Sequence, residues 1–217
     1  MALTSNNQNQ GKLYILKPRG KDKEGNPTKY HFEITEKVEN VYKVTGETNN
    51  ITGDLVSVSA KKGEWEGNAF YEAKLTLEDN TANPPERYIL DLRLSLAVRS
   101  LINGVLNLKS GKNIQIGAYD TKPKEAGGRS YPALSLRQND VRVDWLFKTE
   151  DLPAVEKVNF KGKEMTDTTN VDEFYLTKLN EFSEVVKGWR LVSQSEPKAA
   201  DKGVEKSESA KNDDIPF

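Results

Sequence analysis

Cysteine is absent from the 217-residue chain, and histidine occurs once, at His31. Without cysteine the chain can form no disulfide, no thiolate zinc site and no thiol nucleophile. It contains no apolar run of the roughly 18 residues that a membrane helix requires. Residues 1–10 are polar and lack the apolar stretch of a signal peptide. We therefore expect a cytoplasmic protein without a membrane span, metal or cofactor.

Sequence signatures of enzymes are also missing. The chain has no Walker-type phosphate loop, no GxSxG elbow and no GxGxxG dinucleotide fingerprint. His31 falls in an alternating apolar and polar run, which predicts a surface or sheet-edge position. We expect the protein not to be an enzyme. One alternative stays open, because Asp and Glu are plentiful enough to build a magnesium-dependent nuclease of nucleic acid.

Hydrophobic residues make up only 35% of the chain and charged residues 30%, with a mean hydropathy of −0.72. This composition predicts an ordinary core diluted by polar loops and an unfolded segment. The formal net charge is −1. From Ser195 onward, six acidic residues face four lysines, so the tail carries −2 and the body +1. A nearly neutral total argues against a simple polybasic DNA-coating protein, so the distribution of charge matters more than its sum.

Short runs of alternating apolar and polar residues, separated by turn residues, predict a series of β-strands. The expected strands are 13–17, 30–35, 41–45, 55–60, 70–77, 88–92, 113–119, 133–137 and 141–147. An amphipathic helix is expected at 96–108, with Ser95 as N-cap and with Arg99, Asn103 and Asn107 on its polar side. A second helix is expected at 171–187, ending at Gly188.

This element order predicts a mainly β protein. Its fold is expected to be an OB-like Greek-key barrel with one inserted helix and one C-terminal helix. A β-sandwich with the same number of strands fits the pattern as well. The expected organisation is a disordered leader at 1–11, an OB-like domain at 12–192 and a disordered acidic tail at 193–217.

The chain ends in Asp213-Asp214-Ile215-Pro216-Phe217. This tip resembles the acidic C-terminal tip of bacterial single-stranded DNA-binding proteins, and phage proteins of that class also end in acidic tails with a terminal Phe. The resemblance covers these five residues in sequence and about 25 in architecture. It implies a phage-type single-stranded DNA-binding protein in the host cytoplasm, whose tip binds replication or recombination proteins. Physically, Phe217 offers a partner both an aromatic ring and a free carboxylate.

Two functions from different classes follow. The first is a protein that coats and protects single-stranded DNA in replication, recombination or repair without sequence specificity. Its tail is expected to compete with DNA for a basic groove and to recruit partners when DNA displaces it. The alternative is an interaction module that never touches DNA and uses the tip to capture host replication or repair proteins. The sequence does not determine the oligomeric state.

The alternation of residues along each strand also predicts which aromatic side chains are exposed to solvent. Trp145 and Phe147 share a face with Val141 and Val143, so both are expected in the core. Other aromatics fall opposite the apolar face or in polar loops, and cations accompany them, as base stacking and phosphate neutralisation require. The expected DNA-binding residues are Lys61, Lys62, Trp65, Phe70, Lys74, Tyr119, Lys122, Lys124, Arg129, Tyr131 and Arg137.

Overall fold

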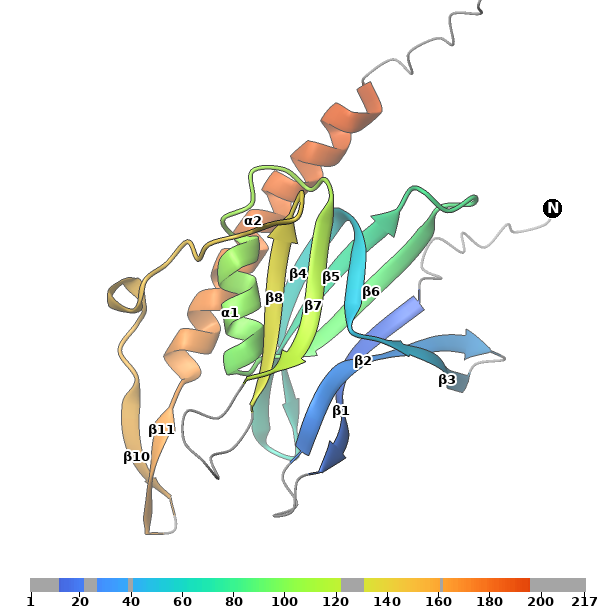
Figure 1. The fold of residues 1–217 in the computed structure, drawn as a ribbon. Helices are drawn as coiled ribbons and strands as arrows, with labels where there is room; N and C mark the ends of the chain where they lie inside the picture. Colours follow the sequence, from blue (N-terminus) through green and yellow to red (C-terminus); the bar gives the residue numbers. More distant parts are fainter. Residues whose placement is uncertain (1–11, 22–26, 39–40, 122–130, 161, 196–217) are drawn as a thin grey trace, which may run out of the picture.

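The computed structural model describes residues 12–21, 27–38, 41–121, 131–160 and 162–195 (Figure 1). Within them, nine strands form one mixed sheet in the order β3-β2-β1-β6-β5-β4-β7-β8-β9. Their bounds are Lys12–Lys21 (β1), Pro27–Val38 (β2), Val41–Thr48 (β3), Asn50–Trp65 (β4), Asn68–Asp79 (β5), Glu86–Arg93 (β6), Ile114–Asp120 (β7), Pro132–Gln138 (β8) and Val141–Arg142 (β9). Glu156–Phe160 (β10) and Lys163–Asp167 (β11) form a separate hairpin. The helices are Leu96–Val105 (α1) and Thr169–Ser195 (α2), with a 3₁₀ turn at Thr149–Asp151.

The mainly β class is confirmed, but the expected closed barrel is wrong. The sheet is open and ends at β3 and β9. Strand β1 occupies the free edge of β6 in parallel, with Leu13 opposite Ile89, so β6 cannot pair there with another strand. The sheet nevertheless coils until β2 reaches β7, where the Tyr30 amide donates to Asp120 Oδ1 at 2.8 Å. The contact between β2 and β7 is thus made by a side chain and not by a ladder of backbone hydrogen bonds.

Most helices and strands are longer than the sequence pattern indicates. Strand β4 spans 16 residues and pairs with both β5 and β7, while α2 continues through Gly188 to Ser195. The predicted tail start at 193 therefore falls inside α2. The β10–β11 hairpin has no predicted counterpart. In the described chain, neither helix is long and apolar enough to cross a membrane.

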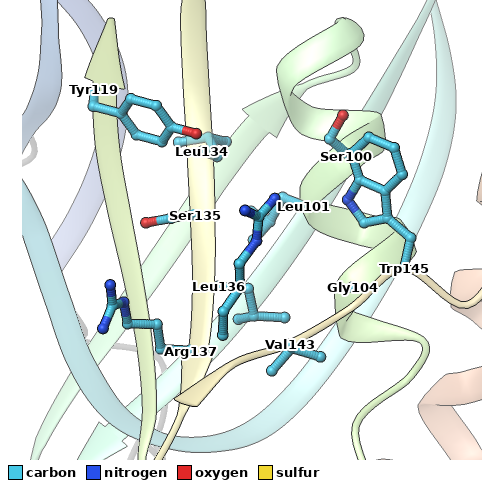
Figure 2. Close-up of a pocket in the computed structure, with 11 residues that line it drawn as sticks. Ser100, Leu101, Gly104, Tyr119, Leu134, Ser135, Leu136, Arg137, Val143 and Trp145 are labelled. Atoms are coloured by element: carbon cyan, nitrogen blue, oxygen red, sulfur yellow. The ribbon is translucent and has the colours of Figure 1, made fainter. Parts of the chain in front are cut away.

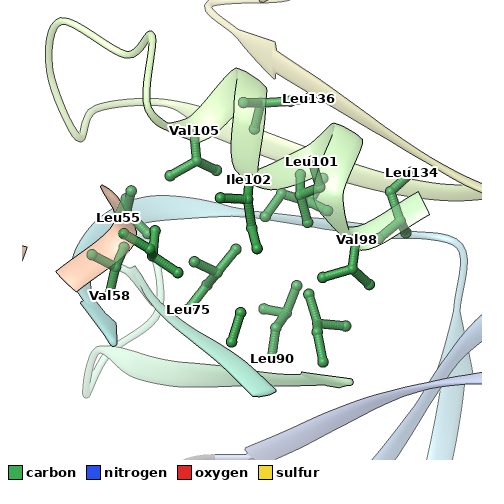
Figure 3. Close-up of a cluster of buried hydrophobic side chains, with 14 of the residues drawn as sticks. Leu55, Val58, Leu75, Leu90, Val98, Leu101, Ile102, Val105, Leu134 and Leu136 are labelled. Atoms are coloured by element: carbon green, nitrogen blue, oxygen red, sulfur yellow. The ribbon is translucent and has the colours of Figure 1, made fainter. Parts of the chain in front are cut away.

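The core lies between α1 and the concave face of the sheet. Ser95 caps α1 as predicted, accepting a hydrogen bond from the Val98 amide. Val98 and Leu101 are 1% exposed, and they face Leu75 and Leu90, which are fully buried (Figure 3). Burying one such side chain contributes about 1.5–3 kcal/mol. The 3.6-residue period of α1 and the two-residue period of the strands thus produce one shared core.

The polar side of α1 binds neighbouring segments instead of solvent. The Arg99 guanidinium donates to both carboxylate oxygens of Asp172 on α2, at 2.7 and 2.9 Å. The Asn103 amide donates to the Phe147 carbonyl at 2.8 Å and accepts from the Phe147 amide at 2.8 Å. Asn103 lies on the predicted polar side of α1, yet it is only 4% exposed. Burial is tolerated because the amide has both of these partners.

Arg99→Ala is expected to lower the free energy of unfolding by about 2–4 kcal/mol, because it leaves the Asp172 carboxylate buried without its partner. The two side chains are 17% and 11% exposed, so water replaces the guanidinium poorly. Urea denaturation measures the loss. Lys178→Ala, which breaks an exposed pair with Glu181, serves as the control, with a change below about 0.5 kcal/mol. Equal losses in the two variants would contradict this account.

Candidate nucleic-acid interface

A pocket of about 310 Å³ lies where β8, the segment 142–145 and α1 meet (Figure 2). We call it the arginine pocket. Figure 2 shows Tyr119 of β7 and Trp145 at opposite sides of it. Among the described residues, the lining contains two guanidinium groups, two aromatic rings and no carboxylate. Its members are Ser100, Leu101, Gly104, Tyr119, Leu134, Ser135, Leu136, Arg137, Arg142, Val143 and Trp145.

Strand alternation in the β7–β8 hairpin produces the exposed face beside this pocket. Tyr119 lies opposite Ala133, and Gly117 lies opposite Ser135. The intervening residues, such as Ile116, are buried in the core. A Cβ at Gly117 would lie 2.7 Å from the Ser135 hydroxyl, closer than real Cβ atoms come. Because Gly117 has no side chain, the exposed face is flat at this position, and the Tyr119 side chain projects from it two residues later.

Tyr119 and Tyr131 are exposed as predicted, by 47% and 61%. The hairpin extends one step past the two strands, since the Thr121 amide donates to the Tyr131 carbonyl at 2.9 Å. The Tyr131 amide in turn donates to Thr121 Oγ1 at 3.0 Å. Because Tyr131 is two residues before Ala133, alternation places the two rings on the same face. The structure thus brings two predicted aromatics together.

Arg137 and Arg142 form a direct cross-strand pair between β8 and β9. Arg137 Nη1 donates to the Asp140 carbonyl at 3.1 Å. Among the described residues, neither guanidinium forms an ion pair with a carboxylate. Like charges directly opposite in a sheet destabilise it. An anion bound between them would remove this repulsion.

Trp145 is 59% exposed, so its predicted core position is wrong. The chain leaves the sheet after Arg142 and is then held by α1 and the turn that follows it. Asn107 Nδ2, in this turn, donates to the Asp144 carbonyl, and the Leu146 amide donates to the Asn103 carbonyl of α1. Strand alternation no longer applies to such a segment. The polar side of α1 was the sequence signal that could have indicated this, because polar side chains there can bind the backbone of a segment that lies outside the sheet.

The remaining described candidates lie toward the far end of the β4–β5 hairpin, and acidic residues accompany them. Lys61 pairs with Glu72 at 2.9 Å, Lys74 with Asp91 at 3.4 Å, and Lys62 with Glu173 of α2 at 2.7 Å. The hydrogen bond from Lys62 lowers the pKa of the Glu173 carboxyl. Each lysine of this set thus has an acidic neighbour, whereas Arg137 and Arg142 have none among the described residues.

The two aromatics of this hairpin also lie apart from the arginine pocket. Phe70 has the Arg93 guanidinium 5.1 Å from its ring centroid, and Trp65, 68% exposed, lies next to the turn. β4 contacts β7 only through residues 50–53, and Gly63 pairs with Phe70. From Gly53 to Gly63 is roughly 30 Å of strand. The structure therefore divides the predicted site in two.

The other predicted residues lie outside the described residues. These are Lys122, Lys124 and Arg129 between β7 and β8, and the tip Asp213, Asp214, Ile215, Pro216 and Phe217.

A second, apolar pocket of about 550 Å³ adjoins the first, and Ser100 and Trp145 line both. The polar groups of Arg99 and Asn103 in its lining already have partners. We call it the apolar pocket. Its lining consists of Leu96, Arg99, Ser100, Asn103, Trp145, Phe147, Thr149, Leu152, Pro153, Ala154, Val155, Val171 and Tyr175.

The described chain contains no group of three His, Asp or Glu side chains that could hold a metal ion. His31 is 2% exposed, which corrects its predicted surface position. Its Nε2 atom lies 3.4 Å from Glu47 Oε1, because β3 covers that side of β2. Comparison with known proteins finds no matching family model, no similar curated protein and no solved structure with a matching fold.

Proposed function

We propose that the protein binds single-stranded DNA without sequence specificity, with the arginine pocket and the adjoining β7–β8 face as its binding surface. One observation carries the proposal: Tyr119, Trp145 and the guanidinium groups of Arg137 and Arg142 line a single pocket, and the described part of its lining has no carboxylate. Rings stack on bases of any sequence, and guanidinium groups neutralise phosphates. This combination is what a sequence-tolerant single-strand binder requires.

The connectivity of β4, β5, β6, α1, β7 and β8 supports an OB-like origin for this surface. In an OB-fold the first strand pairs with the second and the fourth, and β4 pairs with β5 and β7 in the same way. OB-folds bind oligonucleotides across strands 2–3 and with two flanking loops. In chain order, the connection from β7 to β8 corresponds to the connection between strands 4 and 5 of an OB-fold. The chain departs from the pattern on β5 and β6, where ion pairs such as Lys74–Asp91 occupy the face.

The tip Asp213–Phe217 extends the proposal to partners. In this model the acidic tip competes with DNA for Arg137 and Arg142 when no DNA is bound. Bound DNA releases the tip, whose aromatic ring and carboxylate then bind replication or recombination proteins. The resemblance of the tip to bacterial single-stranded DNA-binding proteins supports this part.

Titration of labelled oligothymidine, followed by fluorescence anisotropy, tests the proposal. We expect binding that weakens with salt, with a slope of log K against log [salt] of about −1.4 or steeper, since each neutralised phosphate of a single strand contributes about −0.7. Oligothymidine and mixed-sequence oligonucleotides of equal length should bind within about threefold of each other. The proposal would be refuted if the protein bound oligonucleotides of none of the lengths tested.

The alternative function, an interaction module that never touches DNA, draws support from the apolar pocket. Leu96 and Trp145 on its rim are 76% and 59% exposed, as residues at protein-docking sites often are. The same titration separates the two functions, because an interaction module that does not bind DNA would leave the anisotropy of oligothymidine unchanged. Magnesium-dependent cleavage of the oligonucleotide would instead indicate the third possibility, a nucleic-acid enzyme.

A further inference from the structure

We propose that the arginine pocket binds the terminal phosphate at one end of a DNA strand, so that the protein prefers strands with a phosphorylated end. This inference rests on the proposed function and goes beyond it, because a coating protein needs no preference for ends. Three features of the pocket support it: the paired guanidinium groups, a described lining without carboxylate, and the wall formed by α1.

The paired guanidinium groups select an anion of more than one charge. Arg137 and Arg142 are held opposite each other by the β8–β9 register, so their repulsion is built into the fold. Each guanidinium has five N–H donors, and the described hydrogen bonds use only the one from Arg137 to the Asp140 carbonyl. Arginine forks bind phosphate oxygens in bidentate geometry. The pocket therefore offers donors and positive charge together.

A terminal phosphate fits this charge better than an internal one. A phosphomonoester carries about −1.5 to −2 at pH 7, since its second pKa is near 6. An internal phosphodiester carries a single negative charge. Two guanidinium groups therefore discriminate in favour of the terminal group.

The shape of the pocket also favours an end. Ser100, Leu101 and Gly104 of α1 form one wall, and the pocket volume of about 310 Å³ suits roughly one nucleotide. An internal phosphate must leave room for chain on both sides, whereas a terminal phosphate needs a single exit. That exit lies along the β7–β8 face, where Tyr119 can stack on the first base.

The test compares three oligothymidines of one length, carrying a 5′-phosphate, a 3′-phosphate or hydroxyls at both ends, as unlabelled competitors. We expect one phosphorylated form to bind about tenfold more tightly than the hydroxyl form, the effect of added charge-assisted hydrogen bonds. The arm that gains affinity identifies which end enters the pocket. The preference should shrink as the pH falls from 8 to 5, because the phosphate loses its second charge while both arginines stay protonated.

Arg142→Gln is expected to remove the preference, and Lys109→Gln, an exposed change of equal charge, to keep it. Circular dichroism verifies that both variants fold. Equal affinity for all three oligonucleotides, or an Arg142→Gln loss identical for all three, would overturn the inference while leaving single-strand binding intact. If none of the three binds, the proposed function itself fails and the inference with it.

Discussion

Replacing Tyr119, Tyr131 and Trp145 together by alanine is expected to lower the affinity for oligothymidine by at least about 100-fold. Each ring that stacks on a base contributes about 1–3 kcal/mol, so three rings together exceed the roughly 2.8 kcal/mol that a 100-fold change represents. All three side chains are exposed, by 47%, 61% and 59%, so the core stays intact. Anisotropy titration gives the affinity, and thermal unfolding verifies the fold.

Two controls locate the effect. Tyr42→Ala removes a tyrosine of 62% exposure from the edge strand β3, and the affinity should change less than about twofold. Trp65→Ala with Phe70→Ala removes the two aromatics of the β4–β5 hairpin, and we expect a change below about threefold. If the hairpin variant instead lost more affinity than the triple variant, the DNA path would cross the β5–β6 face, which corresponds to the face that OB-folds use.

Deleting residues 209–217 is expected to preserve or strengthen binding to single-stranded DNA and to abolish capture of replication proteins. Removal of Asp213 and Asp214 leaves Arg137 and Arg142 without an internal competitor. The gain in affinity should be largest at low salt and vanish near 0.5 M, where charges are screened within about 4–5 Å. Titration of the full-length and shortened chains across salt concentrations measures it.

Partner capture is measured by pull-down of purified replication proteins on DNA-coated beads. Phe217→Ala should lose capture as the deletion does, because the ring is the group that a partner can bury. Lys211→Ala, a change in the same segment, should retain it. A truncated chain that failed to bind DNA would contradict the competition model, and one that still captured partners would contradict the role of the tip.

Much of the fold could be predicted from local pattern. The two-residue period of residues 30–35 and 70–77 identified strands β2 and β5, and Ser95 identified the start of α1. Closure of the sheet could not be predicted. It depends on which strand occupies the free edge of β6, and β1 does so in a parallel pairing. Nothing in a strand's own alternation specifies its neighbour.

The candidate site divides in the same way. The exposure of Tyr119, Tyr131 and Arg137 was predicted because, on its own strand, each points to the face of the sheet opposite to that of the apolar residues. Trp145 was placed wrongly, because the segment after Arg142 follows hydrogen bonds from α1 rather than strand geometry. Lys61, Lys62 and Lys74 were expected to be available to phosphate, but their acidic partners come from β5, β6 and α2.

The sequence by itself determined strands β1 to β8, the first turn of α1, the exposure of Tyr119 and Tyr131, and the tip that suggests a partner. These features depend on neighbours within a few positions, where the periods of backbone geometry operate. Only the tertiary structure decided that Arg137 and Arg142 share a pocket with Trp145, and that the β4–β5 lysines have acidic partners. Those outcomes depend on contacts between residues far apart in the chain, which no local period encodes.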